Sequence, residues 1–247
     1  LSKGNQKMND EKATKINGII EGVIWKQILI FFFPILIGTF FQQLYNTVDA
    51  VIVGRFVGKE ALSCVSGSSG QIINLVVGFF TGLSAGATVI ISQHFGAGNK
   101  EKLQRALHTA YAFSIIGGIV VGVAAVFATP AILRIMNTPQ ELMRDSALYV
   151  QIYFAGLLFI FIYNMGAAIL RAVGDTKRPL IFLIISGIAN AALNMTLVII
   201  FHMGVAGVAI GTIISQLISC ILVLTCLYRS EGSYQLRFSK LRINTAY

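Results

Sequence analysis

Apolar residues in this chain come in long runs without a charged side chain. The first run, Gln27–Val48, has about 22 residues, which is enough for a helix that crosses a bilayer. Two later runs, 61–99 and 180–228, are longer than one membrane thickness. The pattern predicts an all-α membrane protein with six transmembrane helices. We expect them at about 26–53, 61–99, 106–128, 146–170 and, in a hairpin divided at 202–204, over the two parts of 180–228.

Glycine, proline and charged residues mark the expected ends of these helices. Pro34 lies in the first turns of the first helix and is expected to kink it. The second helix, long or bent, should end at the turn GAGN, and the third should stop before Pro130. Polar loops are expected at 54–60, 129–145 and 171–179.

The distribution of lysine and arginine sets the expected orientation in the membrane. Fifteen of the 19 lie on the side that holds both termini. The positive-inside rule therefore places both termini in the cytoplasm. We expect the chain to be a multi-pass protein of the plasma (inner) membrane. We expect a cytoplasmic tail over 1–25, a transmembrane lobe over 26–228, and cytoplasmic chain over 229–247.

Composition agrees with this assignment and excludes several other classes of protein. The chain is 55% hydrophobic and only 12% charged, about half the charged fraction of a soluble protein. Topology accounts for the net charge of +9, and the basic loops lack the interleaved aromatic residues of a nucleic-acid site. The three cysteines have no metal-ligand or disulfide spacing. We expect no nucleic-acid partner, no cofactor and no enzymatic activity.

A polar stripe at the end of the first helix carries its only carboxylate. Gln42, Tyr45, Asn46 and Asp49 are spaced i, i+3, i+4 and i+7, so they share one helical face. An ionisable residue within a transmembrane helix costs free energy and usually has a function. The stripe is expected to line a cavity inside the bundle.

Polar residues of two later helices are expected at the same depth as Asp49. Asn190 and Asn194 share a face of the fifth helix, and Thr212 lies in the sixth. A carboxylate removed from water takes up a proton more readily, and carboxylate, amide and hydroxyl oxygens also suit a sodium ion. These residues could therefore couple transport to either cation, with sodium at Asp49 as the one possible metal site. For the two asparagines and the threonine, hydrogen bonds that only join helices remain an alternative.

Several stretches together resemble one transporter family. They are Pro34 and the segments QQLYNTVDAVIVGRFVG (42–58), ISQHFGAGN (91–99), ILRAVGDTKRP (169–179), ANAALN (189–194) and GVAGVAIGT (204–212). In this order they resemble the N-terminal half of a multidrug and toxic compound extrusion (MATE) transporter.

The resemblance implies one six-helix lobe of a twelve-helix antiporter with a substrate cleft between two lobes. Such antiporters exchange sodium or protons for amphipathic, often cationic drugs or toxic compounds. It implies cation coupling at Asp49, with Asn190, Asn194 and Thr212 beside it. It also implies a lobe cavity that Gln42 and Tyr45 face. Residues 229–247 resemble the inter-lobe linker. The implied partners are the lipid bilayer, a small-molecule substrate, and either a second lobe or a second copy of the chain.

Two other functions compete with this interpretation. Gly67-Ser68-Ser69-Gly70 fits the GxSG pattern of rhomboid intramembrane proteases, with Ser69 as nucleophile and His202 as base. A flippase for lipid-linked saccharides of the same superfamily would have more basic residues in its cavity. Because no lysine or arginine falls within the expected helices, the sequence favours drug export.

Overall fold

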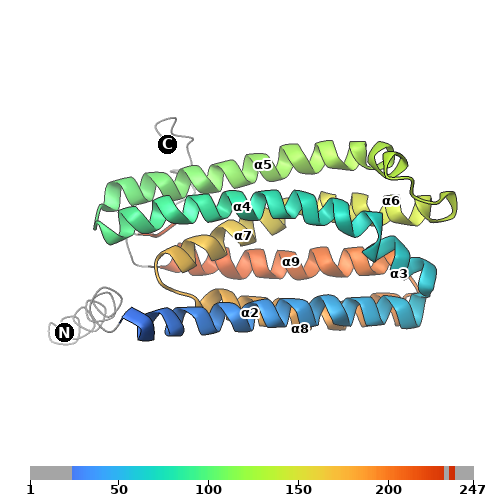
Figure 1. The fold of residues 1–247 in the computed structure, drawn as a ribbon, viewed down its shortest axis with the longest axis horizontal. Helices are drawn as coiled ribbons and strands as arrows, with labels where there is room; N and C mark the ends of the chain where they lie inside the picture. Colours follow the sequence, from blue (N-terminus) through green and yellow to red (C-terminus); the bar gives the residue numbers. More distant parts are fainter. Residues whose placement is uncertain (1–23, 231–233, 237–247) are drawn as a thin grey trace.

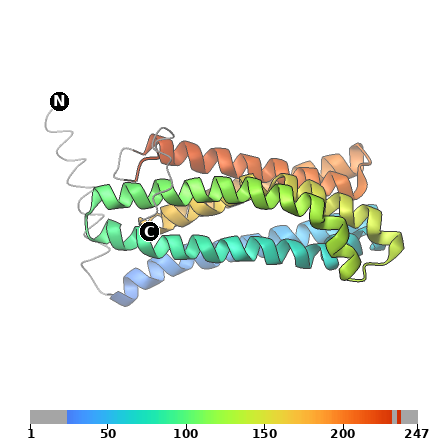
Figure 2. The ribbon, with the colours of Figure 1, turned by 90° about the horizontal axis from the view of Figure 1, so that it is seen from above.

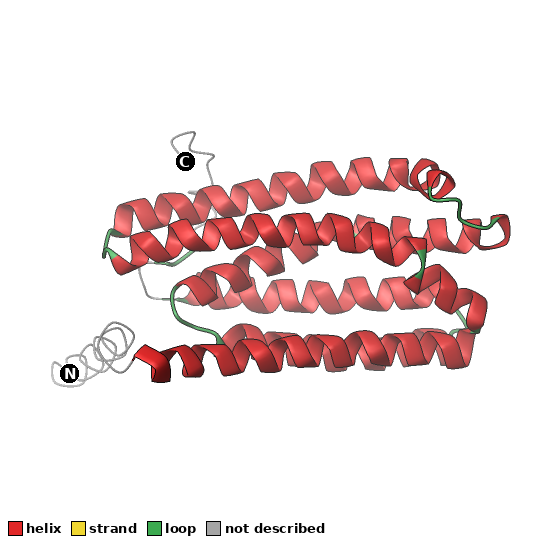
Figure 3. Cartoon of the chain, viewed as in Figure 1, coloured by secondary structure: helices red, strands yellow, loops and turns green. Residues whose placement is uncertain are grey.

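A computed structural model describes residues 24–230 and 234–236. Most of the two expected cytoplasmic tails therefore lies outside the described residues. Within them every regular element is helical. The long helices lie side by side along one axis (Figures 1 and 2) and are joined by short loops (Figure 3). The all-α prediction is confirmed.

Eight α-helices and two π-helical turns form the described bundle. In chain order they are α2 (Ile24–Ile52), η1 (Val53–Val57), α3 (Lys59–Ser66), α4 (Ser68–Gly96), α5 (Lys100–Ile135), α6 (Gln140–Ala155), α7 (Leu157–Ala172), α8 (Lys177–Met195), η2 (Thr196–Ile200) and α9 (Gly204–Arg229).

Length and composition identify most of these elements as membrane spans. Four helical segments are each long and apolar enough to cross a membrane, namely Lys59–Gly96, Lys100–Ile135, Lys177–Ile200 and Gly204–Arg229. The pair α6 and α7, bent by 49°, qualifies as a fifth when it is counted as one span. The first expected span corresponds to α2, which has 29 residues and continues past Pro34. The chain is a multi-pass helical membrane protein.

The second span is interrupted at Gly67, where a single long or bent helix was expected. The expected loop at 54–60 is instead the π-helical turn η1 followed by the start of α3. Gly67 has φ −77° and ψ −129°, and a Cβ there would lie 2.5 Å from the Ser63 carbonyl oxygen. Only glycine fits this break, which separates α3 from α4.

The third span continues beyond its expected end. Proline removes one backbone N–H from a helix and usually ends or kinks it, yet α5 runs through Pro130 to Ile135. The carbonyl of Val126, which would have bonded that missing N–H, accepts a 3.3 Å hydrogen bond from Gln151 Nε2 of α6. A side chain from another helix thus replaces the lost donor.

Two further loops are shorter than expected. The expected loop 129–145 is mostly helical, since only 136–139 separates α5 from α6. The expected loop at 171–179 is helical at both ends, because α7 includes Arg171 and Ala172 and α8 begins at Lys177. The fourth span also breaks at Gly156, where a Cβ would lie 2.5 Å from Ile213 Cγ1 of α9.

The buried core centres on α7, and α2 lies at the edge of the bundle (Figure 1). Ten of the 16 residues of α7 are buried, and Phe161 stacks on Phe80 of α4 with ring centres 3.5 Å apart. By contrast, α2 packs mainly against α8, and most of its large apolar side chains are exposed. The position of α2 therefore depends strongly on its contacts with α8.

Candidate functional site

A cavity of about 570 Å³ lies between α2 and the other helices of the bundle. Along α2 it extends from Pro34 to Ala50, a length of about 24 Å at the rise of an α-helix. The polar and ionisable side chains that line it include Gln42, Tyr45, Asn46, Asp49, Asn74, Tyr149, Tyr153, Tyr163, Asn164, Arg171, Thr212 and Gln216.

The predicted polar stripe lines this cavity. Gln42, Tyr45, Asn46 and Asp49 are all lining residues, as one helical face requires. Tyr45 also forms a side-chain hydrogen bond with Thr212 of α9. The stripe thus joins α2 to the opposite wall.

A chain of hydrogen bonds links Asp49 to the predicted residues of α8 and α9. Asn194 Nδ2 donates to Asp49 Oδ1 at 2.6 Å and to Asn190 Oδ1 at 3.0 Å. Asn190 Nδ2 in turn donates to Thr212 Oγ1 and to Ser215 Oγ, both at 3.4 Å. Three helices therefore meet in one polar network around a single carboxylate.

The two asparagines lie behind the cavity wall. Both are 0% exposed and neither lines the cavity, whereas Asp49 and Thr212 do. Asp49 is therefore the member of the network that presents a charge to the cavity, and Asn194 holds it from behind.

The parallel course of α2 and α8 explains this meeting. Gly38 lies against Leu180 and Leu183, because a Cβ there would lie 3.6 and 3.9 Å from their side chains. Eleven residues further along each helix, Asp49 meets Asn194. Asn190 follows one turn below Asn194, as i and i+4 positions do.

One polar atom of the network has no partner. Asn194 Oδ1 is buried and forms no hydrogen bond within the described part of the chain. It lies against the backbone of Gly211 in α9, where a Cβ would overlap it. The small residue at 211 thus allows α9 to approach the network, and the free oxygen gives the site one spare acceptor.

Several lining residues were not expected from the sequence, above all Arg171. The expected fourth helix stopped at Leu170, whereas α7 continues to Ala172 and Arg171 reaches the cavity. The expectation that no basic side chain falls within the spans is therefore wrong. Among the lining residues Asp49 is the one carboxylate and Arg171 the one guanidinium. Tyr149 and Tyr153 show the i, i+4 spacing that marks a shared face, a signal present in the sequence.

The residues of the protease alternative do not form a site. Ser69 is completely buried in α4, and its Oγ has no hydrogen-bond partner among the described residues. His202 is exposed in the turn between η2 and α9, with φ at 52°. Ser69 therefore has no base within hydrogen-bonding distance. The described residues contain no group of three or more histidine, cysteine, aspartate or glutamate side chains that could hold a metal ion.

Known proteins are similar to this chain in sequence and in fold. The MatE family model matches residues 34–196. The chain is 31% identical over 221 residues to the probable multidrug resistance protein YoeA of Bacillus subtilis (strain 168), covering 88% of this chain and 47% of that protein. It is 33% identical over 197 residues to YpnP, another probable multidrug resistance protein of that organism, covering 79% and 44%.

Solved structures show the same relationship. A MATE transporter in its bent conformation superposes with a TM-score of 0.75 at 25% identity, covering 81% of this chain and 44% of that one. An outward-facing multidrug resistance MATE family transporter gives a TM-score of 0.80 at 23% identity, covering 86% and 47%. The second likeness shows the fold alone.

The chain spans about half the length of the curated relatives it matches. The family match runs from Pro34 in α2 to Thr196 in η2, so it includes Asp49 and both asparagines of the polar network. It stops before α9, which carries Thr212 and Ser215. Since the family model matches more than half of its residues, the chain belongs to the MatE family of multidrug and toxic compound extrusion transporters.

Proposed function

We propose that this chain is the N-terminal lobe of a cation-coupled antiporter that exports amphipathic, often cationic compounds. The observation that carries this proposal is Asp49, the one carboxylate lining the cavity, held by a buried network. A charge inside a membrane protein costs free energy, so a carboxylate placed at a cavity wall favours a role in binding ions.

The coupling step is a change of charge at Asp49. When ionised, its carboxylate accepts a charge-assisted hydrogen bond from Asn194, the stronger kind of hydrogen bond. A bound proton neutralises the carboxylate, and a bound sodium ion shares its charge. Either cation therefore weakens the hydrogen bond between α2 and α8. Because α2 packs mainly on α8, we propose that it then moves, with Pro34 as the expected kink.

The network has the donor atoms for sodium as well as for a proton. Sodium prefers oxygen ligands, and Asp49, Thr212 and the amide of Asn194 can supply them. The oxygen of Asn194 already lacks a hydrogen-bond partner, and an asparagine amide can present either end to a neighbour. The residues present fit sodium, and protonation of Asp49 needs no further group.

The cavity suits an amphipathic cation. Four tyrosines, Tyr45, Tyr149, Tyr153 and Tyr163, line it with apolar side chains between them. Aromatic faces attract cations, and Asp49 provides the opposite charge. A cation at the carboxylate and a compound in the cavity would compete for the same charge, which is the basis of exchange.

The proposal includes the membrane arrangement and the partner. The protein lies in the plasma (inner) membrane. Both termini are cytoplasmic, because the side of the bundle that holds them carries most of the lysine and arginine residues. Since relatives are about twice as long as this chain, a second lobe or a second copy completes the cleft.

Arg171 is the observation that favours the second candidate, a flippase for lipid-linked saccharides. Its guanidinium lines the cavity, and such a group binds phosphate. The carboxylate and the tyrosines favour a cationic compound, so drug export remains the first candidate.

Efflux of ethidium from cells that express the native protein containing this chain tests the proposal. Asp49→Asn should abolish energised efflux while expression stays normal. Asp145→Asn is the matched control, since Asp145 is exposed on α6 and outside the cavity. Unchanged efflux in the Asp49 variant would contradict the proposal.

A further inference from the structure

Arg171 is the one guanidinium that lines the cavity, and none of the described acidic residues forms an ion pair with it. The ion pairs between described residues are Arg105 with Glu101 and Arg178 with Asp175. Arg171 belongs to neither. Tyr163 of the same helix also lines the cavity, and its hydroxyl donates to the Pro179 carbonyl oxygen at 3.3 Å. A cation within a membrane protein normally pairs with an acid or a carbonyl, so an unpaired one needs a reason.

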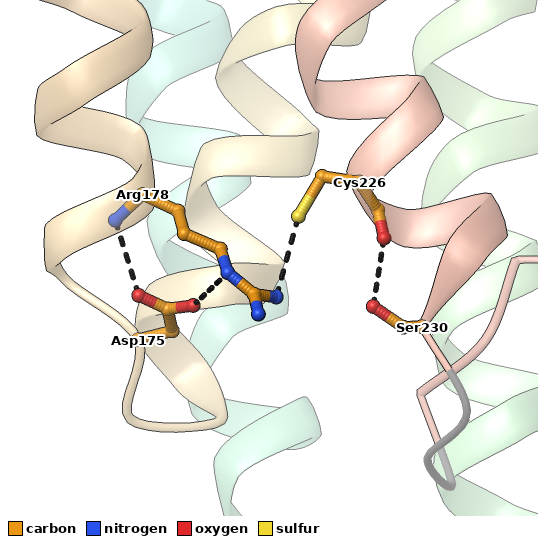
Figure 4. A network of polar contacts seen from close by, with 4 residues as sticks. All are labelled: Asp175, Arg178, Cys226 and Ser230. Atoms are coloured by element: carbon orange, nitrogen blue, oxygen red, sulfur yellow. Dashed lines mark hydrogen bonds and ion pairs between the residues drawn. The ribbon is translucent and has the colours of Figure 1, made fainter.

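The nearest acid in sequence is already engaged. Asp175 forms an ion pair through Oδ2 with Arg178 Nε at 3.2 Å, and its Oδ1 accepts a hydrogen bond from the Arg178 backbone N–H at 3.1 Å. Arg178 Nη1 lies 3.5 Å from Cys226 Sγ of α9, so its guanidinium lies between Asp175 and Cys226 (Figure 4). Asp175 therefore serves Arg178 and is not the counter-ion of Arg171.

Membrane topology alone does not account for the position of Arg171. Lys177 and Arg178 follow it at the same end of the bundle, and both are exposed. A residue needed only for the positive-inside rule would extend to the interface as they do. Arg171 is instead half-buried and lines the cavity beside Tyr163 and Thr176.

Arg171 and Asp49 lie at opposite ends of the cavity. Tyr163 donates to the Pro179 carbonyl oxygen at 3.3 Å, which fixes this part of α7 against the start of α8. Asp49 meets Asn194, near the other end of α8. The 15 residues from Pro179 to Asn194 correspond to about 22 Å of helix. The cavity is thus negative at one end, positive at the other, and aromatic between them.

We propose that Arg171 forms an anion-binding subsite, which takes the carboxylate or phosphate of an amphiphilic ligand whose remainder occupies the aromatic part of the cavity. The guanidinium presents a planar fork of donors that matches both groups. This inference rests on the proposed function only in treating the cavity as the place where ligands bind. It adds that an amphiphilic cation which also carries an anionic group binds better than a cation of the same shape without one, because its two charges meet Asp49 and Arg171.

A pair of dyes tests this subsite without any ion gradient. Rhodamine B carries a free carboxylate, and its ethyl ester is the same molecule without that charge. Fluorescence anisotropy measures the binding of each to the native protein in maltoside micelles. Arg171→Gln should weaken binding of rhodamine B about tenfold, the effect of one charge-assisted contact, and change binding of the ester less than twofold. Arg178→Gln is the control and should change neither.

Each outcome separates the subsite from the coupling role of Asp49. Equal losses for both dyes, or no loss for either, would overturn the anion subsite and leave Asp49 untouched. If the glutamine variant does not fold, Arg171→Lys is measured in its place. This variant keeps the positive charge, so it must keep the preference for rhodamine B. Loss of that preference would overturn the proposal. Failure of both dyes to bind the unaltered protein would overturn the cavity as a ligand site, and with it both proposals.

The anion could belong to a soluble compound or to a lipid headgroup. The same titration in nanodiscs with and without phosphatidylglycerol distinguishes them. Competition by the lipid, lost in Arg171→Gln, supports the subsite and assigns it to lipid phosphate. Binding of rhodamine B that is insensitive to the lipid supports the subsite and assigns it to the compound in the cavity.

Discussion

Asn194 holds Asp49 by a 2.6 Å hydrogen bond, and this bond joins α8 to α2, the helix at the edge of the bundle. The same amide also donates to Asn190. One buried asparagine thus connects the carboxylate that faces the cavity to the interior of the lobe.

Removing this amide should destabilise the lobe. In Asn194→Ala both Asp49 and Asn190 lose a donor, and an unpaired buried group costs about 1–3 kcal/mol. Thermal unfolding in detergent should therefore begin at a clearly lower temperature. Asn46→Ala is the control, because Asn46 is exposed and bonds only Gln43, one turn away. Similar midpoints for the two variants would show that the buried network contributes little stability.

Gly211 should tolerate no side chain. A Cβ there would overlap Asn194 Oδ1, so Gly211→Ala must move α9 or break the network. We expect a lower unfolding temperature and weaker coupling of efflux to the cation gradient. On α8, Gly187→Ala meets nothing within 4 Å and should be neutral or stabilising by up to about 1 kcal/mol, since alanine favours helix. The reverse order of stability would contradict the close approach at Gly211.

The bond that replaces the missing donor at Pro130 can be measured with a double-mutant cycle. Gln151→Ala alone leaves the Val126 carbonyl without its donor. In a Pro130→Ala background the backbone N–H returns, so the same change should cost less, by about 1 kcal/mol. Unfolding free energies of the four proteins test this coupling. Strict additivity would mean that Gln151 does not compensate for the proline.

The break at Gly67 should likewise require glycine. A Cβ would lie 2.5 Å from the Ser63 carbonyl oxygen, an atom of the backbone that cannot rotate away. Gly67→Ala should lower the unfolding temperature and make the junction of α3 and α4 more accessible to protease. Gly78→Ala, at an open position of α4, serves as the control. Equal protease sensitivity of the two would argue against a constrained break.

The sequence predicted the helical bundle and the residues around Asp49 for the same reason. Long charge-free runs require helices in a membrane, and i, i+4 spacing places Asn190 and Asn194 on one face. Orientation from the basic residues then sets Asn194 and Thr212 at the depth of Asp49. The common depth of these residues could thus be predicted from the sequence, whereas the hydrogen bond between Asp49 and Asn194 is known only from the fold.

Other features depended on partners far away in the sequence. Pro130 stops a helix by local rules, but Gln151 of another helix supplies the missing donor. Nothing in the local sequence distinguishes Gly156 from the other glycines. Its requirement for glycine comes from the close approach of Ile213 in α9. A charge usually ends an apolar run, so the sequence predicts a loop that begins at Arg171, and only the fold shows that this residue lines the cavity.

Asp49 is proposed to couple the movement of a compound to that of a cation. The most direct measurement uses the native protein in liposomes, where a proton or a sodium gradient is imposed and accumulation of ethidium is followed. Accumulation should depend on one of the two gradients in the unaltered protein and in Asp145→Asn, and it should depend on neither in Asp49→Asn. Gradient-driven accumulation that persists in Asp49→Asn would contradict the account.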